Sequence, residues 1–131
     1  MQDFLHVTGM VLKSIPVGEY DRAVTILTTG KGKISAFARN ARKQNNRFMA
    51  AVSPFCFGTF KLYAGRNSYI MAEAEISNYF EKLWEDLEGA CYGMYFLEVA
   101  DFYTRENNDD AEMLKLLYQS LRALLHKNLD N

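Results

Sequence analysis

Residues 18–43 read GEYDRAVTILTTGKGKISAFARNARK and contain two β-type segments joined by a glycine-containing turn. The second segment, 33–39, places Ile34, Ala36 and Ala38 in strict alternation with polar or aromatic neighbours. Such alternation is typical of a strand with one buried and one solvent-facing side. We therefore predict a β-hairpin, and the basic run after it continues the solvent-facing side.

Three further segments show strand patterns around this hairpin. They are 4–15, which Gly9 interrupts at an expected bulge or sharp bend, 55–63, and 69–76. In the last segment the alternation predicts that Ile70, Ala72, Ala74 and Ile76 face inward. Five strands in about 76 residues favour a small closed barrel of the oligonucleotide/oligosaccharide-binding (OB) type, whereas a sandwich usually has about seven strands.

The hydrophobic period becomes helical after residue 78. Asn78 and Glu81 form a candidate capping box, and Gly89 and Gly93 suggest either a break or close packing. The expected apolar stripes are Phe80, Leu83, Leu87, Ala90, Met94 and Leu97, and then Leu114, Leu117, Leu121 and Leu124, after a second cap at Asp109 and Glu112. We predict an α+β chain, with a five-stranded OB-fold barrel at 1–78 and the start of a helical domain at 79–131.

Residues 83–102 are apolar nearly all round, so this helix needs more partners than one neighbour supplies. We therefore expect the chain to be the front part of a larger protein. It has 131 residues and two cysteines, Cys56 and Cys91, which lie among apolar neighbours. Buried free thiols in a reducing compartment are the expectation. The sequence shows no secretory leader pattern and no apolar run of membrane-spanning length, so a cytoplasmic location is expected.

No pattern in the sequence indicates an enzyme. His6 and His126 belong to no spaced set of metal ligands, so neither a catalytic residue nor a metal site is predicted. The GKGK segment at 30–33 lacks the spacing of a phosphate-binding loop and opens no helix. We expect an ordinary turn there.

The net charge of −1 conceals two halves of opposite sign. Residues 1–66 hold ten Lys or Arg and three acids, whereas residues 67–131 hold five Lys or Arg and thirteen acids. A basic half suggests a polyanionic partner, most often a phosphate backbone. A solvated basic face on an ordinary domain explains the charge equally well.

Several short motifs follow one another in the chain: GEYDR at 18–22, GKI at 32–34 and RNARK at 39–43, then Phe48, PF at 54–55, YAGR at 63–66 and AE at 72–73. In this order and spacing they resemble RecO, the bacterial recombination mediator family. The family usually has glycine where Asn40 stands, and Asn is the next most tolerant residue for positive φ. RecO proteins are longer than 131 residues, and the four-cysteine zinc module of many members is not in this segment. No cofactor is expected within it.

The resemblance implies a non-enzymatic DNA repair factor, cytoplasmic and associated with the bacterial nucleoid. Such proteins bind single- and double-stranded DNA, anneal complementary strands and, with RecR, help load RecA onto strands coated by single-stranded-DNA-binding protein. A barrel face with cations and aromatics suits contact with phosphates and bases. The residues expected to contact phosphates are Arg22, Lys33, Arg39, Arg42, Lys43, Arg47, Lys61 and Arg66, with Phe37, Phe48 and Tyr63 as stacking candidates.

Each aromatic also has a packing interpretation. Phe37 could pack against a loop, Phe48 could plug the barrel, and Tyr63 could form a cross-strand pair. The rival function is a protein-interaction module, in which the helical half docks a partner and the basic barrel is neutralised by the acidic helices. A salt-sensitive affinity for any DNA sequence separates the two functions.

Overall fold

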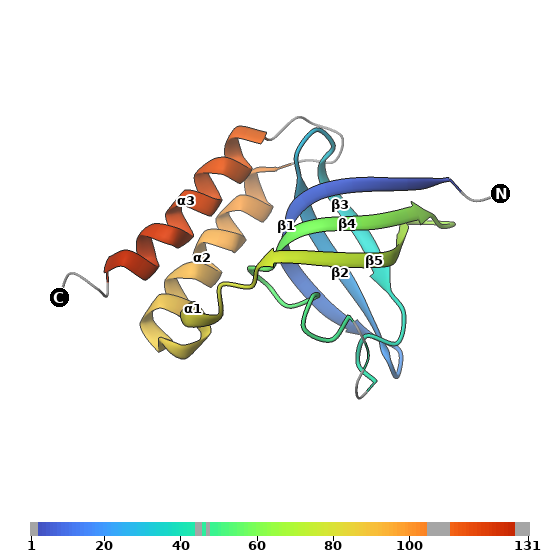
Figure 1. The fold of residues 1–131 in the computed structure, drawn as a ribbon, viewed down its shortest axis with the longest axis horizontal. Helices are drawn as coiled ribbons and strands as arrows, with labels where there is room; N and C mark the ends of the chain where they lie inside the picture. The colour runs from blue at the N-terminus through green and yellow to red at the C-terminus, as the bar shows by residue number, and fades with distance from the viewer. Residues whose placement is uncertain (1–2, 44–45, 47, 105–110, 128–131) are drawn as a thin grey trace.

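A computed structural model describes residues 3–43, 46, 48–104 and 111–127. Five strands come first: β1 (Phe4–Val17), β2 (Asp21–Thr28), β3 (Gly32–Ala38), β4 (Phe57–Ala64) and β5 (Tyr69–Asn78). Three helices follow: α1 (Glu81–Glu85), α2 (Leu87–Tyr103) and α3 (Ala111–Lys127). Figure 1 shows the strands as one barrel, with α2 and α3 lying side by side at one side of it.

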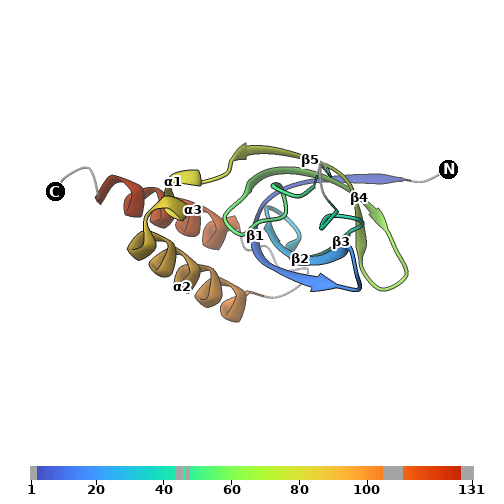
Figure 2. The same cartoon turned by 90° about the horizontal axis from the view of Figure 1, so that it is seen from below.

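The strands close into a barrel in the order β1-β2-β3-β5-β4 (Figure 2). All neighbouring strands pair antiparallel except β3 and β5, which pair in parallel over the short register Ala36↔Tyr69 and Phe37↔Ile70. The predicted hairpin is confirmed, because β2 pairs with β3 from Arg22↔Ala38 to Thr28↔Gly32. A closed barrel leaves no sheet edge, and the predicted OB-fold is confirmed.

The irregularity in β1 lies later than Gly9. The β1–β2 register shifts between Val11 and Lys13, so Leu12 is the extra residue. Gly9 instead permits close packing, since a Cβ there would lie 2.4 Å from the Leu27 carbonyl oxygen. The bulge changes which residues face the barrel interior, and Leu12 packs with the helices.

A second irregularity corrects the predicted inward face of β5. The β4–β5 register goes from Lys61↔Glu73 to Leu62↔Met71, so one residue is skipped. Met71 is therefore buried, whereas Ile70 and Ala72 are only partly buried. Beyond the bulge, Ala74 and Ile76 pack against the barrel core as predicted.

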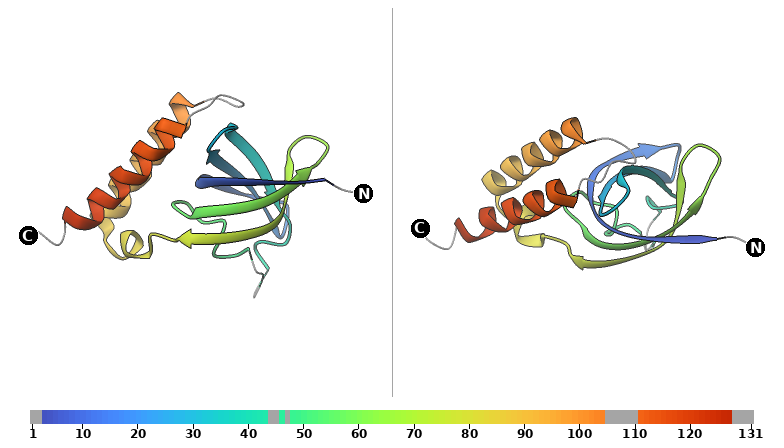
Figure 3. Two further views of the ribbon diagram at one scale, coloured as in Figure 1. Left: turned by 45° about the horizontal axis from the view of Figure 1, so that its top comes forward. Right: turned by 90° about the horizontal axis from the view of Figure 1, so that it is seen from above.

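Two hydrophobic cores form. One fills the barrel and includes Val24, Ile26, Ala36 and Phe60. The other lies between barrel and helices, and joins Met10, Leu12, Leu27 and Phe55 to Leu83, Leu97, Leu114, Leu117 and Leu121. Both views in Figure 3 show the helical pair against one flank of the barrel. The division into 1–78 and 79–131 stays a prediction, because this second core draws residues from both parts.

The helical stripe differs from the predicted one on α2. Leu87 is 81% exposed, and the buried positions of α2 are Gly89, Gly93, Leu97 and Ala100. The glycines mark close packing: a Cβ on Gly93 would lie 2.8 Å from the Phe55 ring. The break lies earlier, at Asp86, whose extended backbone separates α1 from α2. The α3 stripe is confirmed, with Leu114, Leu117 and Leu121 buried and Leu124 packed beside them.

The start of the helical segment uses no capping box. Phe80 is the N-cap of α1, with φ of 52°, and no side chain caps it. The Asn78 side chain instead accepts a hydrogen bond from Phe80 N (2.8 Å) and donates one to the Tyr118 hydroxyl (3.1 Å). The second predicted cap includes Asp109, which lies outside the described residues.

The two cysteines differ. Cys56 is a buried free thiol as expected, but Cys91 is exposed on α2, which corrects the prediction for that residue. Within the described ranges, no helix is both long and apolar enough to cross a membrane.

Candidate nucleic-acid interface

Two basic segments meet at the open end of the β2–β3 hairpin. The turn before β2 contacts the chain that leaves β3 through three hydrogen bonds. Asn40 N donates to Asp21 Oδ1 (2.7 Å), Arg42 N donates to Tyr20 O (2.7 Å), and Arg42 Nη1 donates to Gly18 O (3.0 Å). Segments about twenty residues apart in the sequence therefore form one unit, which we call the basic corner (residues 18–22 and 39–43).

The backbone of the basic corner requires special residues. Gly18 and Asn40 both have φ of 60°, in the left-handed region that favours Gly and then Asn. The expectation that Asn40 retains a glycine-type turn is confirmed. Lys43 Nζ lies 4.9 Å from the centroid of the Tyr20 ring, a cation–π distance. Arg39, Arg42 and Lys43 are all exposed there.

Arg22 lies at the open end of the barrel. It follows the same alternation as Val24 and Ile26, which are buried in the barrel core, and is itself partly buried. Its Nη1 donates to the Ser14 carbonyl oxygen and to the Ser14 hydroxyl, each at 3.3 Å. Arg22 and Arg42 both line a cavity of about 360 Å³.

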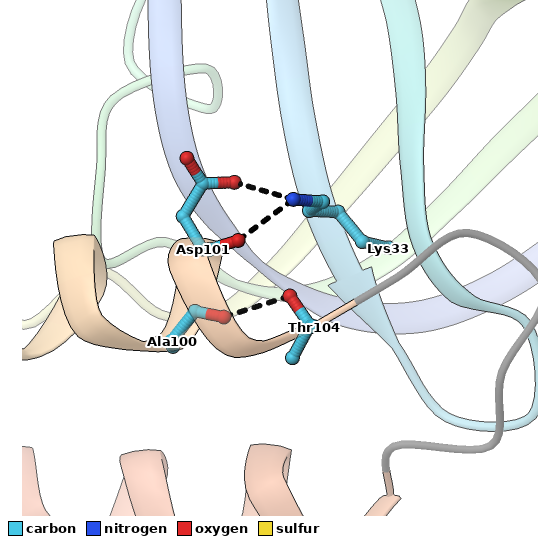
Figure 4. Close-up of polar contacts among 4 residues, drawn as sticks. All are labelled: Lys33, Ala100, Asp101 and Thr104. Atoms are coloured by element: carbon cyan, nitrogen blue, oxygen red, sulfur yellow. Dashed lines mark hydrogen bonds and ion pairs between the residues drawn. The ribbon is translucent and has the colours of Figure 1, made fainter.

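Lys33 does not belong to this surface. Its Nζ donates to the Asp101 carbonyl oxygen (2.7 Å) and pairs with Asp101 Oδ1 (3.0 Å) at the end of α2, where Thr104 also caps the Ala100 carbonyl (Figure 4). The last turn of α2 has no basic residue of its own, and a cation is favourable at a helix C-terminus. Lys33 therefore joins the barrel to the helices, and its predicted phosphate contact stays a prediction.

The three stacking candidates are placed differently. Phe48 is 5% exposed and packs in the barrel core, as the plug interpretation predicts, and its role in base stacking stays a prediction. Tyr63 pairs across the strands with Phe4, in an edge-to-face contact with ring centroids 6.0 Å apart. Phe37 lies on the outer side of β3, partly buried, opposite Ala23 and Ile70. Of the three, only Phe37 lies on the β2–β3 face, and its stacking role stays a prediction.

The remaining cations are separate from the basic corner. Lys61 Nζ lies 4.3 Å from the Phe4 ring centroid, and the register pairs Lys61 with Glu73 on β5. Arg66 is exposed in the β4–β5 loop, where it lines a cavity of about 310 Å³ with Ser35 and Tyr69. Arg47 lies outside the described residues. The structure thus gathers Arg22, Arg39, Arg42 and Lys43, and leaves Lys33, Lys61 and Arg66 elsewhere.

Reasoning from the sequence missed the support of this corner. Tyr20 and Asp21 are absent from the predicted site residues, yet they hold the exit from β3. Their place beside Arg22 in the GEYDR motif was the available signal. Among the described residues, no group of three or more His, Cys, Asp or Glu gathers as a candidate metal site.

Comparison with known proteins agrees with this fold. The family model described as Recombination protein O N terminal matches residues 1–80, which contain the whole barrel. This chain belongs to the RecO family. OB-folds commonly bind oligonucleotides with the face of strands 2 and 3 and with the loops between strands 1 and 2 and between strands 4 and 5. In this RecO-family chain the basic corner includes the first of those loops, and Arg66 lies in the second.

Curated relatives carry the same family name. The chain is 32% identical over 122 residues to "DNA repair protein RecO" from Clostridium novyi, covering 93% of this chain and 48% of the relative. It is 35% identical over 116 residues to the protein of that name from Bacillus pumilus, covering 88% and 45%. The chain therefore spans about half the length of the RecO relatives it matches.

Proposed function

We propose that this chain is the nucleic-acid-binding part of a bacterial DNA repair protein, and that it binds single- and double-stranded DNA without sequence preference. The names of its RecO relatives support the repair role. The OB-fold supports DNA as the ligand, since such barrels hold strands by phosphate contacts and base stacking rather than by reading sequence.

One observation carries the proposal: the basic corner gathers cations that the sequence separates. Arg22 lies at the start of β2, while Arg39, Arg42 and Lys43 follow β3. Hydrogen bonds between the two segments hold these cations at one end of the barrel. Such a cluster binds a phosphate backbone chiefly by releasing its counterions.

The finer activities belong to the proposal for the full-length protein. Strand annealing, work with RecR, loading of RecA and contact with single-stranded-DNA-binding protein follow from the family resemblance. The OB barrel would supply DNA affinity to these activities, in the cytoplasm and at the nucleoid.

A salt titration of single-strand binding tests the proposal. Arg42→Ala with Lys43→Ala should weaken binding to all sequences alike and lower the slope of log affinity against log salt by about 1.4, or about 0.7 for each lost phosphate contact. The matched control is Lys82→Ala with Lys115→Ala, which removes two exposed cations from the helices. A basic-corner variant with the parental affinity and slope would contradict this placement of the DNA.

A protein-interaction module is the second candidate, because α2 exposes large apolar side chains. Phe102 is 72% exposed, Tyr103 67% and Tyr95 60%. Exposed apolar patches often mark interaction sites. On this hypothesis the chain self-associates or binds an apolar-surface dye, and Phe102→Ser with Tyr103→Ser abolishes both effects. A clean monomer in sedimentation at high concentration, without dye binding, would contradict it.

A further inference from the structure

The cavity at the basic corner has the composition of an anion site. Its volume is about 360 Å³, within the usual range of small-ligand pockets. Two guanidinium groups and two hydroxyls line it, from Arg22, Arg42, Ser14 and Ser53. None of the described lining residues is acidic. Two like charges on one cavity repel each other, and an anion between them removes that repulsion.

Both arginines are held by contacts that engage only part of their donor capacity. A guanidinium has five N–H donors in a planar fork. Within the part of the chain that the structure describes, the side-chain contacts of Arg22 use Nη1 alone, at the long distance of 3.3 Å to Ser14. Those of Arg42 with described residues also use Nη1 alone, at 3.0 Å to Gly18 O. Anchoring through one nitrogen fixes each side chain and leaves the other nitrogens of the fork for a ligand.

Apolar residues line the rest of the cavity. Ala41 and Val52 are buried, at 1% and 2% exposure, and Met49, which is 45% exposed, supplies apolar surface that a ligand can reach. An apolar wall beside two arginines suits a phosphate that carries an organic group better than it suits a hydrated inorganic ion. Tetrahedral phosphate oxygens also match paired guanidinium forks, which bind them bidentately.

We propose that this cavity is a discrete pocket for one backbone phosphate of a nucleic acid, held between Arg22 and Arg42 with its sugar against Met49. The inference rests on the proposed DNA-binding function and makes it more specific. One phosphate enters the mouth of the barrel, whereas the exposed Arg39 and Lys43 act through charge alone. A substitution of Arg by Lys keeps the charge and changes the shape of the side chain. It should weaken the contact in the pocket but not a contact that acts through charge alone.

Charge-conserving substitutions test the pocket. Arg22→Lys keeps the charge and loses the fork, so affinity for a single-stranded oligothymidylate should fall about tenfold, the equivalent of one charge-assisted hydrogen bond. Arg122→Lys, at an exposed position of α3 away from the basic corner, is the matched control and should bind as the parent does. If both variants bind as the parent does, the pocket is wrong, while the proposed function stands on the parental binding.

Two further measurements cover the remaining outcomes. If Arg22→Lys fails to fold, Ser53→Asp tests the pocket, because a carboxylate in the cavity should weaken binding at least about tenfold. Ser35→Asp, at the exposed position of β3, should weaken binding less. Equal effects of the two variants would overturn the pocket. If the parent does not bind oligothymidylate, the proposed function fails. The pocket is then tested by the Arg22 Nε–H resonance during titration with thymidine 5′-monophosphate, a phosphate that carries an organic group, and a resonance that does not move overturns it.

Discussion

Asp21 and Asn40 join the two ends of the β2–β3 hairpin, because the backbone N–H of Asn40 donates a 2.7 Å hydrogen bond to the Asp21 carboxylate. Asp21 is an acid in the middle of a basic surface, and charge alone makes it unfavourable for binding DNA. Its hydrogen bond gives it a positioning role, since it holds the chain segment that carries Arg39 and Arg42.

Replacement of Asp21 separates position from charge. Asp21→Ala should cost about 1 kcal/mol of folding free energy and weaken single-strand binding, although it removes a negative charge. Glu19→Ala, in the same turn, removes the same charge without removing this bond, and should leave affinity unchanged or raise it. Fluorescence anisotropy with a labelled oligonucleotide measures both. Stronger binding by Asp21→Ala would show that its charge matters more than its hydrogen bond.

The left-handed backbone conformation at Asn40 predicts how replacements of this residue change the stability of the protein. Asn40→Gly should leave stability within about 0.5 kcal/mol of the parent, because glycine adopts positive φ freely. Asn40→Val should cost about 1–2 kcal/mol, because its branched Cβ clashes in that conformation. Chemical denaturation measures both. Equal stability of the two variants would mean that the turn relaxes to negative φ.

The contact of Lys33 with Asp101 predicts an asymmetric pair of variants. Lys33→Met loses both the ion pair and the bond to the Asp101 carbonyl oxygen, and should cost about 1–2 kcal/mol. Asp101→Asn keeps the carbonyl bond and should cost less than about 1 kcal/mol, because both side chains are partly exposed and screened. Denaturation at low and high salt measures the pair. We also expect Lys33→Met to bind single-stranded DNA with the affinity of the parent. A lower affinity would indicate that Lys33 contacts the DNA.

The bulge in β5 predicts that truncating Met71 destabilises the protein more than truncating its neighbour Ile70. Met71→Ala should cost about 2–5 kcal/mol, the usual range for truncating a buried Met. Ile70→Ala should cost clearly less, because Ile70 is only partly buried. Thermal unfolding orders the two. A larger loss of stability for Ile70→Ala than for Met71→Ala would indicate that β5 alternates without a bulge.

The cysteines should react differently. Burial raises the pKa of the Cys56 thiol from an ordinary value of 9.0 to about 11, although a hydrogen bond from the Ser53 backbone opposes this. At pH 8 a thiol reagent should label the exposed Cys91 in the folded protein and reach Cys56 only after denaturation. Because the folded pKa is the higher one, the contribution of Cys56 to stability is present below pH 9 and lost as pH rises through 11. In Cys56→Ser that loss should be absent.

Local patterns in the sequence were enough to predict much of this protein. The alternation of 33–39 predicted β3 and its buried Ile34, Ala36 and Ala38, and strand count then predicted the closed barrel. The α3 stripe followed from its helical period. These features depend on neighbours within a few residues, so the sequence carries them directly.

The tertiary structure alone decided which way several side chains face. A bulge such as that near Ala72 depends on the pairing partner, and one strand's alternation does not contain it. Lys33 and Arg39 have the same local pattern, yet Lys33 meets Asp101, which lies 68 residues later, and Arg39 stays exposed at the other end of β3. The gathering of Arg22 with Arg42 likewise depends on closing the hairpin and the barrel. Contacts between distant segments set these positions, because the packing of two elements is a property of both.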